Sequence, residues 1–244
     1  MEGEMVTHDG LKRLDLTVTQ PASGYRFSLD ALLLADFVTG RDDTSFIDLG
    51  TGSGIIPLIL CRRFPRSTAV AVENNPDMVE IAKGNAAQNE LSDRCEIIHA
   101  DVTSLKSLYP VSTFDLVVSN PPYRTVDSGR VSPRTGRDTA RHESTARLTD
   151  FLSAAKYLVK PSGRICFVYH PDRLAEFVHR ATEQNLSLLR LRMVHGVPHG
   201  NARIFLAELA KDSRAGTVVM PPLVIRGEDG DYTWEAKALF GEDS

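Results

Sequence analysis

Short apolar runs that alternate with helical patterns are the feature of this chain that most restricts its fold. Apolar runs rich in β-branched residues lie at Phe46–Leu49, Ala69–Val72, Glu96–His99, Leu116–Ser119 and Arg164–Tyr169. Helical patterns separate several of them, at Ile55–Phe64, at Pro76–Asn89 with Asn75 as its N-cap, and at Ser144–Val159 before Pro161-Ser162-Gly163. Continuous apolar strands in alternation with helices are typical of a parallel sheet covered on both faces. We therefore expect an α/β fold with helices on both faces.

Two longer strand-like segments end the alternating region. Leu186–Val194 and Ala202–Leu209 follow a helical pattern at about Asp172–Asn185 and are joined by the turn-rich residues 196–201. Two strands joined by such a turn predict an antiparallel hairpin, here at the edge of the sheet. A later piece, Pro221–Ile225, is also extended in character.

Composition excludes several kinds of protein. The formal net charge of −4 leaves no overall basic surface, so a nucleic-acid partner would have to be bound by a local patch. Cys61, Cys95 and Cys166 have neither zinc-ligand nor disulfide spacing, which indicates buried reduced thiols and no metal site. The N-terminus lacks a signal pattern and no apolar run is long enough to span a membrane, so we expect a cytoplasmic protein without membrane contact.

A glycine-rich turn follows the first of the apolar runs, in the order Asp48-Leu49-Gly50-Thr51-Gly52-Ser53-Gly54. Glycines after a strand allow backbone N–H groups to approach a ligand where a Cβ would collide. A pyrophosphate-binding turn would need a third glycine where Ile55 stands, which disfavours an NAD-dependent oxidoreductase. The turn instead fits an amino-acid portion and a ribose, with Asp48 available to a methionine ammonium through ordered water.

Two more acids follow the next two strands. Glu73 is placed to accept hydrogen bonds from two ribose hydroxyls, and Asp101 from an exocyclic adenine amine, with Asn74 and Val102 beside them. Each acid alone can equally be a solvated strand end or a helix cap. Their position beside the glycine turn favours S-adenosylmethionine as cofactor, with S-adenosylhomocysteine as its product.

Asn120-Pro121-Pro122-Tyr123 follows the fourth strand. The lone pair of an exocyclic amine or an amide nitrogen is delocalised, so such a nitrogen is a poor nucleophile. The Asn120 side-chain oxygen and the Pro121 carbonyl can accept its two N–H bonds and stabilise the positive charge that develops during attack. Prolines hold these carbonyls rigidly, and Pro122 and Tyr123 offer a surface on which a planar substrate can stack. The motif predicts methyl transfer to a planar nitrogen, with Asn120, Pro121 and Tyr123 as catalytic residues.

These motifs, in this order, resemble the bacterial valine-tRNA adenine N6-methyltransferase family over about residues 10–226. The resemblance includes the segment from Gly24 to Ala35 and Ala140-Arg141-His142-Glu143. It implies a Rossmann-like, seven-stranded methyltransferase sheet, mostly parallel with an antiparallel C-terminal hairpin. It also implies that Phe27 and Asp30 lie near the methionine end of the cofactor.

The expected domain organisation is one compact unit. Leu14–Thr19 and Gly24–Phe27 are strand-like, and Ser28 is an N-cap for a helix of about Leu29–Val38. Residues 1–40 would then form an N-terminal hairpin and capping helix over the cofactor site. Residues 41–244 would form the methyltransferase domain with a short C-terminal extension.

A basic segment follows the catalytic motif. Residues 124–147 hold six arginines and three acids, a net charge of +3 in an acidic chain. This charge suits phosphate contacts with RNA, made by Arg124, Arg134, Arg137 and Arg141, although a solvated loop has the same composition. The strand-end residues Arg190, Arg192, His195, His199 and Arg203 either extend this basic face or are simply solvated.

The expected substrate is therefore an adenine amine in tRNA or other structured RNA, with no obligate protein partner. Asn-Pro-Pro-Tyr is also shared with methyltransferases that act on a protein glutamine amide or on guanine N2, and these substrates stay open. A non-catalytic S-adenosylmethionine-binding protein that activates a partner is the alternative from another class, disfavoured by the intact catalytic motif.

Overall fold

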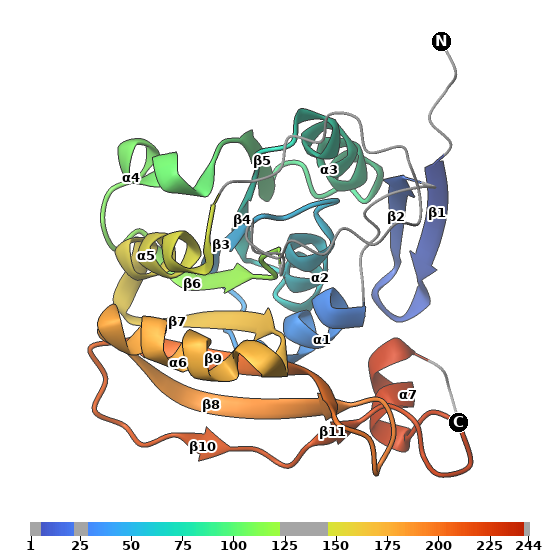
Figure 1. The fold of residues 1–244 in the computed structure, drawn as a ribbon. Coiled ribbons are helices and arrows are strands. Elements are labelled where there is room, and N and C mark those ends of the chain that lie inside the picture. The colour runs from blue at the N-terminus through green and yellow to red at the C-terminus, as the bar shows by residue number, and fades with distance from the viewer. Residues whose placement is uncertain (1–5, 22–28, 123–145, 242–244) are drawn as a thin grey trace, which may run out of the picture.

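The computed structural model describes residues 6–21, 29–122 and 146–241, which form a central sheet with helices on both faces (Figure 1). Its seven main strands have the order β5-β4-β3-β6-β7-β9-β8. Their bounds are β3 Ser45–Leu49, β4 Thr68–Glu73, β5 Cys95–His99, β6 Phe114–Ser119, β7 Val159–Tyr169, β8 Leu186–His195 and β9 Ala202–Lys211. All neighbours are parallel except β9, which is antiparallel to both β7 and β8. The expected sheet and its C-terminal hairpin are confirmed.

Two short strands extend the sheet beyond the expected seven. β10 (Val218–Val219) and β11 (Leu223–Val224) both pair in parallel with β8. They come from the segment after β9, which runs back along the edge of the hairpin and leads to helix α7 (Trp234–Phe240). The C-terminal residues therefore cover an edge strand that would otherwise expose its backbone donors and acceptors.

The helices divide between the two faces of the sheet (Figure 1). On one face lie α1 (Leu29–Phe37), α2 (Ile55–Arg63) and α3 (Pro76–Gln88). On the other lie α4 (Leu105–Leu108), α5 (Leu148–Leu158) and α6 (Leu174–Glu183), with 3-10 turns η2 (Val102–Ser104) and η3 (Pro171–Arg173). Each face has its own buried cluster, and alternate residues of one strand enter different clusters: Val118 packs on the α1 face and Val117 on the α5 face.

The link between α5 and β7 differs from the expectation that Pro161-Ser162-Gly163 would only end a helix. Helix α5 stops at Leu158, and β7 begins at Val159 and runs through the Pro-Ser-Gly residues. A Cβ at Gly163 would come within 2.6 Å of the Asp115 carbonyl oxygen. Gly163 therefore allows β7 to pass close to β6, at the irregularity in register between Phe114 and Leu116.

The N-terminal hairpin pairs β1 (Val6–Leu11) with β2 (Leu16–Pro21), joined by η1 (Lys12–Leu14). The expected strand Leu14–Thr19 overlaps β2, and its partner is the earlier β1; Gly24–Phe27 lies outside the described residues. Amide side chains of α3 then hold β2: Asn85 and Asn89 each accept from and donate to a β2 backbone group, at Thr19 and Thr17. These two side chains hydrogen-bond to the backbone of β2 in the way that a second neighbouring strand would.

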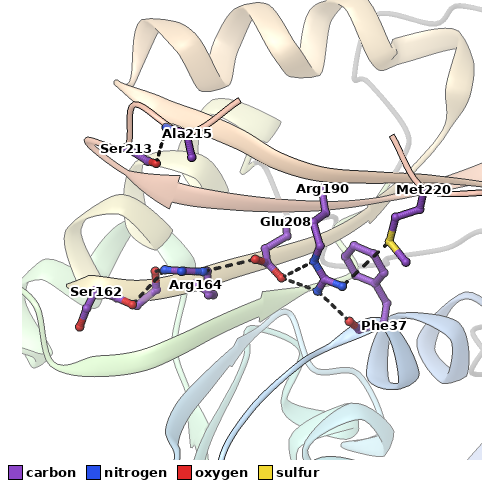
Figure 2. A network of polar contacts seen from close by, with 9 residues as sticks. Phe37, Ser162, Arg164, Arg190, Glu208, Ser213, Ala215 and Met220 are labelled. Atoms are coloured by element: carbon purple, nitrogen blue, oxygen red, sulfur yellow. Dashed lines mark hydrogen bonds and ion pairs between the residues drawn. The ribbon is translucent and has the colours of Figure 1, made fainter. Parts of the chain in front are cut away.

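A buried charge network holds the C-terminal hairpin against β7 and α1 (Figure 2). Glu208 of β9 forms ion pairs with Arg164 of β7 and Arg190 of β8. Arg190 also donates to the Phe37 carbonyl at 3.1 Å and lies over the Phe37 ring at the end of α1. The network thus connects three strands and one helix. Within the ranges that the structure describes, no helix is long and apolar enough to cross a membrane.

Candidate methyl-transfer site

The glycine turn joins β3 to α2 and is built on positive φ angles. Gly50, Gly52 and Gly54 have φ of 76°, 57° and 82°, a backbone conformation that residues other than glycine rarely adopt. The N–H groups of Gly50 and Thr51 both donate to the Val72 carbonyl, at 2.9 and 2.8 Å. The turn is therefore fixed to the end of the neighbouring strand β4. All three predicted glycines are needed for its backbone conformation.

Asp48 lies beneath this turn and is fully buried. Its Oδ2 accepts from the Thr51 hydroxyl at 2.6 Å, whereas its Oδ1 has no hydrogen-bond partner. Burial raises the pKa of Asp48 to about 7; the Thr51 hydrogen bond lowers it in part and the nearby Glu73 charge raises it further. The buried Ser53 hydroxyl also has no partner. Two buried polar atoms, one in the turn and one just before it, therefore have hydrogen-bonding capacity that a polar ligand or an ordered water can use.

Glu73 ends β4 and braces the turn. One carboxylate oxygen, Oε2, accepts from the Gly52 N–H at 2.9 Å. The other, Oε1, accepts from the N–H groups of Asn74 and Asn75 at 3.0 Å each. A carboxylate has about four acceptor positions, so Oε2 retains capacity for one further donor. The geometry is compatible with a ribose hydroxyl at Oε2, and the assignment to ribose stays a prediction.

Asp101 and Val102 follow β5. Asp101 Oδ1 caps η2 by accepting from the backbone N–H and the hydroxyl of Thr103, at 2.8 and 2.6 Å. This is the helix-cap role that the sequence left open; an adenine contact would have to use Oδ2. Val102 is buried in the cluster on the α5 face, and the Asn74 carbonyl accepts from His99 Nε2 at 3.0 Å. All of these residues lie at the carboxyl edge of the sheet.

Asn120 follows β6, the strand next to β3. The Ser119 hydroxyl donates to the Leu49 carbonyl at 2.7 Å, which ties the end of β6 to the residue before Gly50. Asn120 is 9% exposed, Pro121 is buried and Pro122 is exposed. The structure therefore brings the predicted catalytic residues Asn120 and Pro121 beside the predicted cofactor turn.

For the other predicted residues the structure gives no contact with this cluster. Asp30 is in the first turn of α1 and lines a cavity together with residues of the β8–β9 turn, and its assignment to the cofactor stays a prediction. Phe27, Tyr123, Arg124, Arg134, Arg137 and Arg141 lie outside the described residues. The sequence did not single out Thr51, Ser53 or Ser119, although hydroxyl residues inside and beside strand-end motifs are the signal that points to them.

Comparison with known proteins decides the family. A family model described as a methyltransferase domain matches residues 41–216. The tRNA1(Val) (adenine(37)-N6)-methyltransferase of Porphyromonas gingivalis is 35% identical over 204 residues, covering 81% of this chain and 78% of the relative. The enzyme of the same name from Vibrio campbellii is 30% identical, covering 98% and 99%. The chain belongs to the tRNA1(Val) (adenine(37)-N6)-methyltransferase family.

Solved structures agree on the fold of this tRNA1(Val) (adenine(37)-N6)-methyltransferase family member. A predicted O-methyltransferase from Agrobacterium tumefaciens superposes with a TM-score of 0.72 at 22% identity, covering 87% of this chain and 96% of that one. TrmN from Thermus thermophilus gives a TM-score of 0.56 at 23% identity, covering 74% and 48%. The chain is thus an S-adenosylmethionine-dependent methyltransferase with the class I fold.

The residues present fit S-adenosylmethionine. The turn has no Cβ at Gly50, Gly52 or Gly54, and Asp48 Oδ1 is a buried acceptor without a donor, suited to a cationic group. Among the described residues, no group of three or more acids, cysteines or histidines is arranged to hold a metal ion.

Proposed function

We propose that this protein transfers a methyl group from S-adenosylmethionine to the exocyclic N6 amine of adenine 37 in tRNA1(Val), the reaction in the names of its relatives. The observation that carries the proposal is the Ser119–Leu49 hydrogen bond, which joins the strand end bearing Asn120 to the strand end bearing the glycine turn. Methyl donor and acceptor amine would then meet between two adjacent strands. A cytoplasmic location belongs to the same proposal.

Each residue has a role that follows from its position. Asp48 and the glycine turn, joined by the Thr51–Asp48 hydrogen bond, would hold the amino-acid end of the cofactor, and Glu73, joined to the turn by the Gly52–Glu73 hydrogen bond, would hold its ribose. The cofactor supplies an electrophilic methyl group on a positively charged sulfur. The Asn120 side-chain oxygen and the Pro121 carbonyl accept the two N–H bonds of the adenine amine and stabilise the charge that develops on nitrogen. The amine needs no strong base, because its proton can leave to water after transfer; positioning and electrostatics account for the rate.

Asn120→Ala tests this assignment. The change removes a preorganised acceptor from the reacting nitrogen, so kcat should fall by roughly two to three orders of magnitude. Cofactor affinity, measured by calorimetry, should stay nearly the same, because Asp48 and Glu73 remain. Turnover close to wild type would contradict the catalytic role.

Mass spectrometry identifies the substrate. Digests of tRNA and of protein from cells with and without this gene should differ by one N6-methyladenosine in tRNA1(Val). Loss of a methyl group from guanine N2 or from a glutamine side chain would assign the same chemistry to one of the other two substrates. Identical methylation in both cell types, with intact cofactor binding, would favour a non-catalytic role.

A further inference from the structure

A cavity of about 520 Å³ is lined by none of the glycine-turn residues, nor by Asp48, Glu73 or Asn120. Three segments line it: the start of α1, the turn between β8 and β9, and the residues after β11. The turn is closed by His195, whose Nδ1 donates to the Gly200 carbonyl at 2.8 Å. The cavity is large enough for a small ligand or a single nucleotide, since ligand pockets have volumes of about 300–1,000 Å³.

The cavity lies at the same edge of the sheet as Asn120. Strands β6, β7 and β8 run in one direction, so their carboxyl ends share an edge (Figure 1). The register pairs Ser119 with Phe167 of β7, and Phe167 with Ala207 of β9. Ile204, which lines the cavity, is three residues before Ala207 in an antiparallel strand and is therefore level with the residues just after Ser119. Two strand spacings, about 10 Å, separate β9 from β6.

The cavity also lies on the same face of the sheet. Ile204 and Val194, both in its lining, belong to the cluster on the α1 face, as does Val118 of β6. Asn120 follows Val118 by two residues, and alternation along an extended chain directs it to that face. A part of the substrate next to an amine bound at Asn120 can therefore reach the cavity.

The lining combines apolar walls with cationic groups. Leu33, Ile204 and Ile225 form buried walls. Arg203 and Arg226 are exposed and line the cavity, against the single acid Asp30. Arg203 has no hydrogen-bond or ion-pair partner among the described residues, unlike Arg190 and Arg192, which pair with Glu208 and Glu235. Arg226 is oriented by the Tyr232 ring, 4.3 Å from its guanidinium carbon, and by the Gly230 carbonyl.

Two arginines over apolar walls match a nucleotide, because a guanidinium binds phosphate in a fork and a base or ribose covers apolar surface. We propose that this cavity binds a nucleotide adjacent to the target adenosine, with Arg203 and Arg226 on its phosphate. The proposal rests on the RNA substrate of the proposed function and assigns a second contact to it.

Arg203→Ala is the main test, with Arg66→Ala as its matched control. Arg66 is also exposed, but it lies before β4, at the opposite edge of the sheet. With an unmodified tRNA1(Val) transcript, Arg203→Ala should raise KM for RNA roughly tenfold and lower the salt slope of binding by about one, with kcat within about twofold. Arg203→Lys should recover part of the loss. Cofactor affinity and Tm should match wild type, because Arg203 has no partner among the described residues of the fold.

A modified RNA locates the contact. Transcripts are made in which one of the phosphates flanking the target adenosine is replaced by an uncharged methylphosphonate. At one of these phosphates the replacement should weaken RNA binding by the wild type about as much as Arg203→Ala does, and it should not weaken binding by Arg203→Ala further. Equal KM values for Arg203→Ala and Arg66→Ala on RNA that the wild type methylates would overturn the nucleotide contact alone. Wild-type protein that neither binds nor methylates RNA would instead overturn the proposed function.

Discussion

At the scale of one residue, Asp48 is a buried carboxyl group whose ionisation lowers the stability of the folded protein. Its carboxyl group is fully buried, with one oxygen bonded to Thr51 and the other without a partner. Burial raises its pKa from 3.8 to about 7. A carboxyl group whose pKa is higher in the folded protein destabilises that state progressively as pH rises from the unfolded pKa to the folded one. A cation at Oδ1 reverses this effect, because it favours the ionised form.

Cofactor affinity should therefore depend on pH. Between about pH 8 and pH 7 the affinity of wild-type protein for S-adenosylmethionine should change little. Below pH 7 it should fall, by up to about tenfold per pH unit, as Asp48 becomes protonated. Calorimetric titration between about pH 5.5 and 8.5 measures this change.

Asp48→Asn is the control for that titration. It should bind the cofactor weakly and without the decline below pH 7. Without ligand, its Tm relative to wild type should rise as pH increases from about 5 to 7 and level off above about 8, because only wild type then holds a buried charge. A wild-type affinity that is constant across the range would rule out Asp48 as the partner of a cationic group.

At the scale of elements, the C-terminal hairpin is held by charge as well as by backbone pairing. The Glu208 side chain is 7% exposed and bonded by two arginines from different strands, one of which reaches α1 (Figure 2). Burial raises the pKa of the neighbouring Cys166 thiol, and the Glu208 charge raises it further. Removing one member of a buried pair leaves the others without compensation, which costs more than the pair itself contributes.

Glu208→Ala should lower the free energy of unfolding by about 2–4 kcal/mol, somewhat below a fully buried pair because the Arg164 side chain is 43% exposed. Urea denaturation measures this change. Glu80→Ala, which removes an exposed pair with Lys83 on α3, should leave stability nearly unchanged. If both variants unfold at the same urea concentration, the network contributes no more than a surface ion pair.

At the scale of the whole molecule, the sheet order brings together motifs far apart in sequence. β3 lies between β4 and β6, so the glycine turn, Glu73 and Asn120 meet at one edge. The hairpin β8–β9 places the exposed Arg203 at the same edge. An acidic chain thus carries an exposed positive charge at the edge where these motifs meet.

Replacing Arg134, Arg137 and Arg141 together with alanine should weaken tRNA binding. It should also flatten the plot of log K against log salt concentration, by up to about one unit of slope for each phosphate that the variant no longer neutralises. Binding measured between about 50 and 200 mM salt tests this. The matched control replaces Arg41, Arg66 and Arg214, which are exposed and lie outside the basic segment. Arg62 and Arg94 are unsuitable as controls because they bond to backbone carbonyls. Equal slopes for the two triple variants would exclude phosphate contacts by the basic segment.

Features that depend only on neighbouring residues could be predicted from the sequence. Glycines at positive φ, apolar runs of strand length and the Asn75 cap each follow from neighbouring residues, and all three agree with the structure. Other contacts became known only from the folded chain, because their partners are distant in sequence. Asn85 bonds to Thr19 across 66 positions, Ser119 to Leu49 across 70, and Arg190 to Phe37 across 153. No local pattern predicts which pairs of distant groups will come into contact, because that depends on how the whole chain packs.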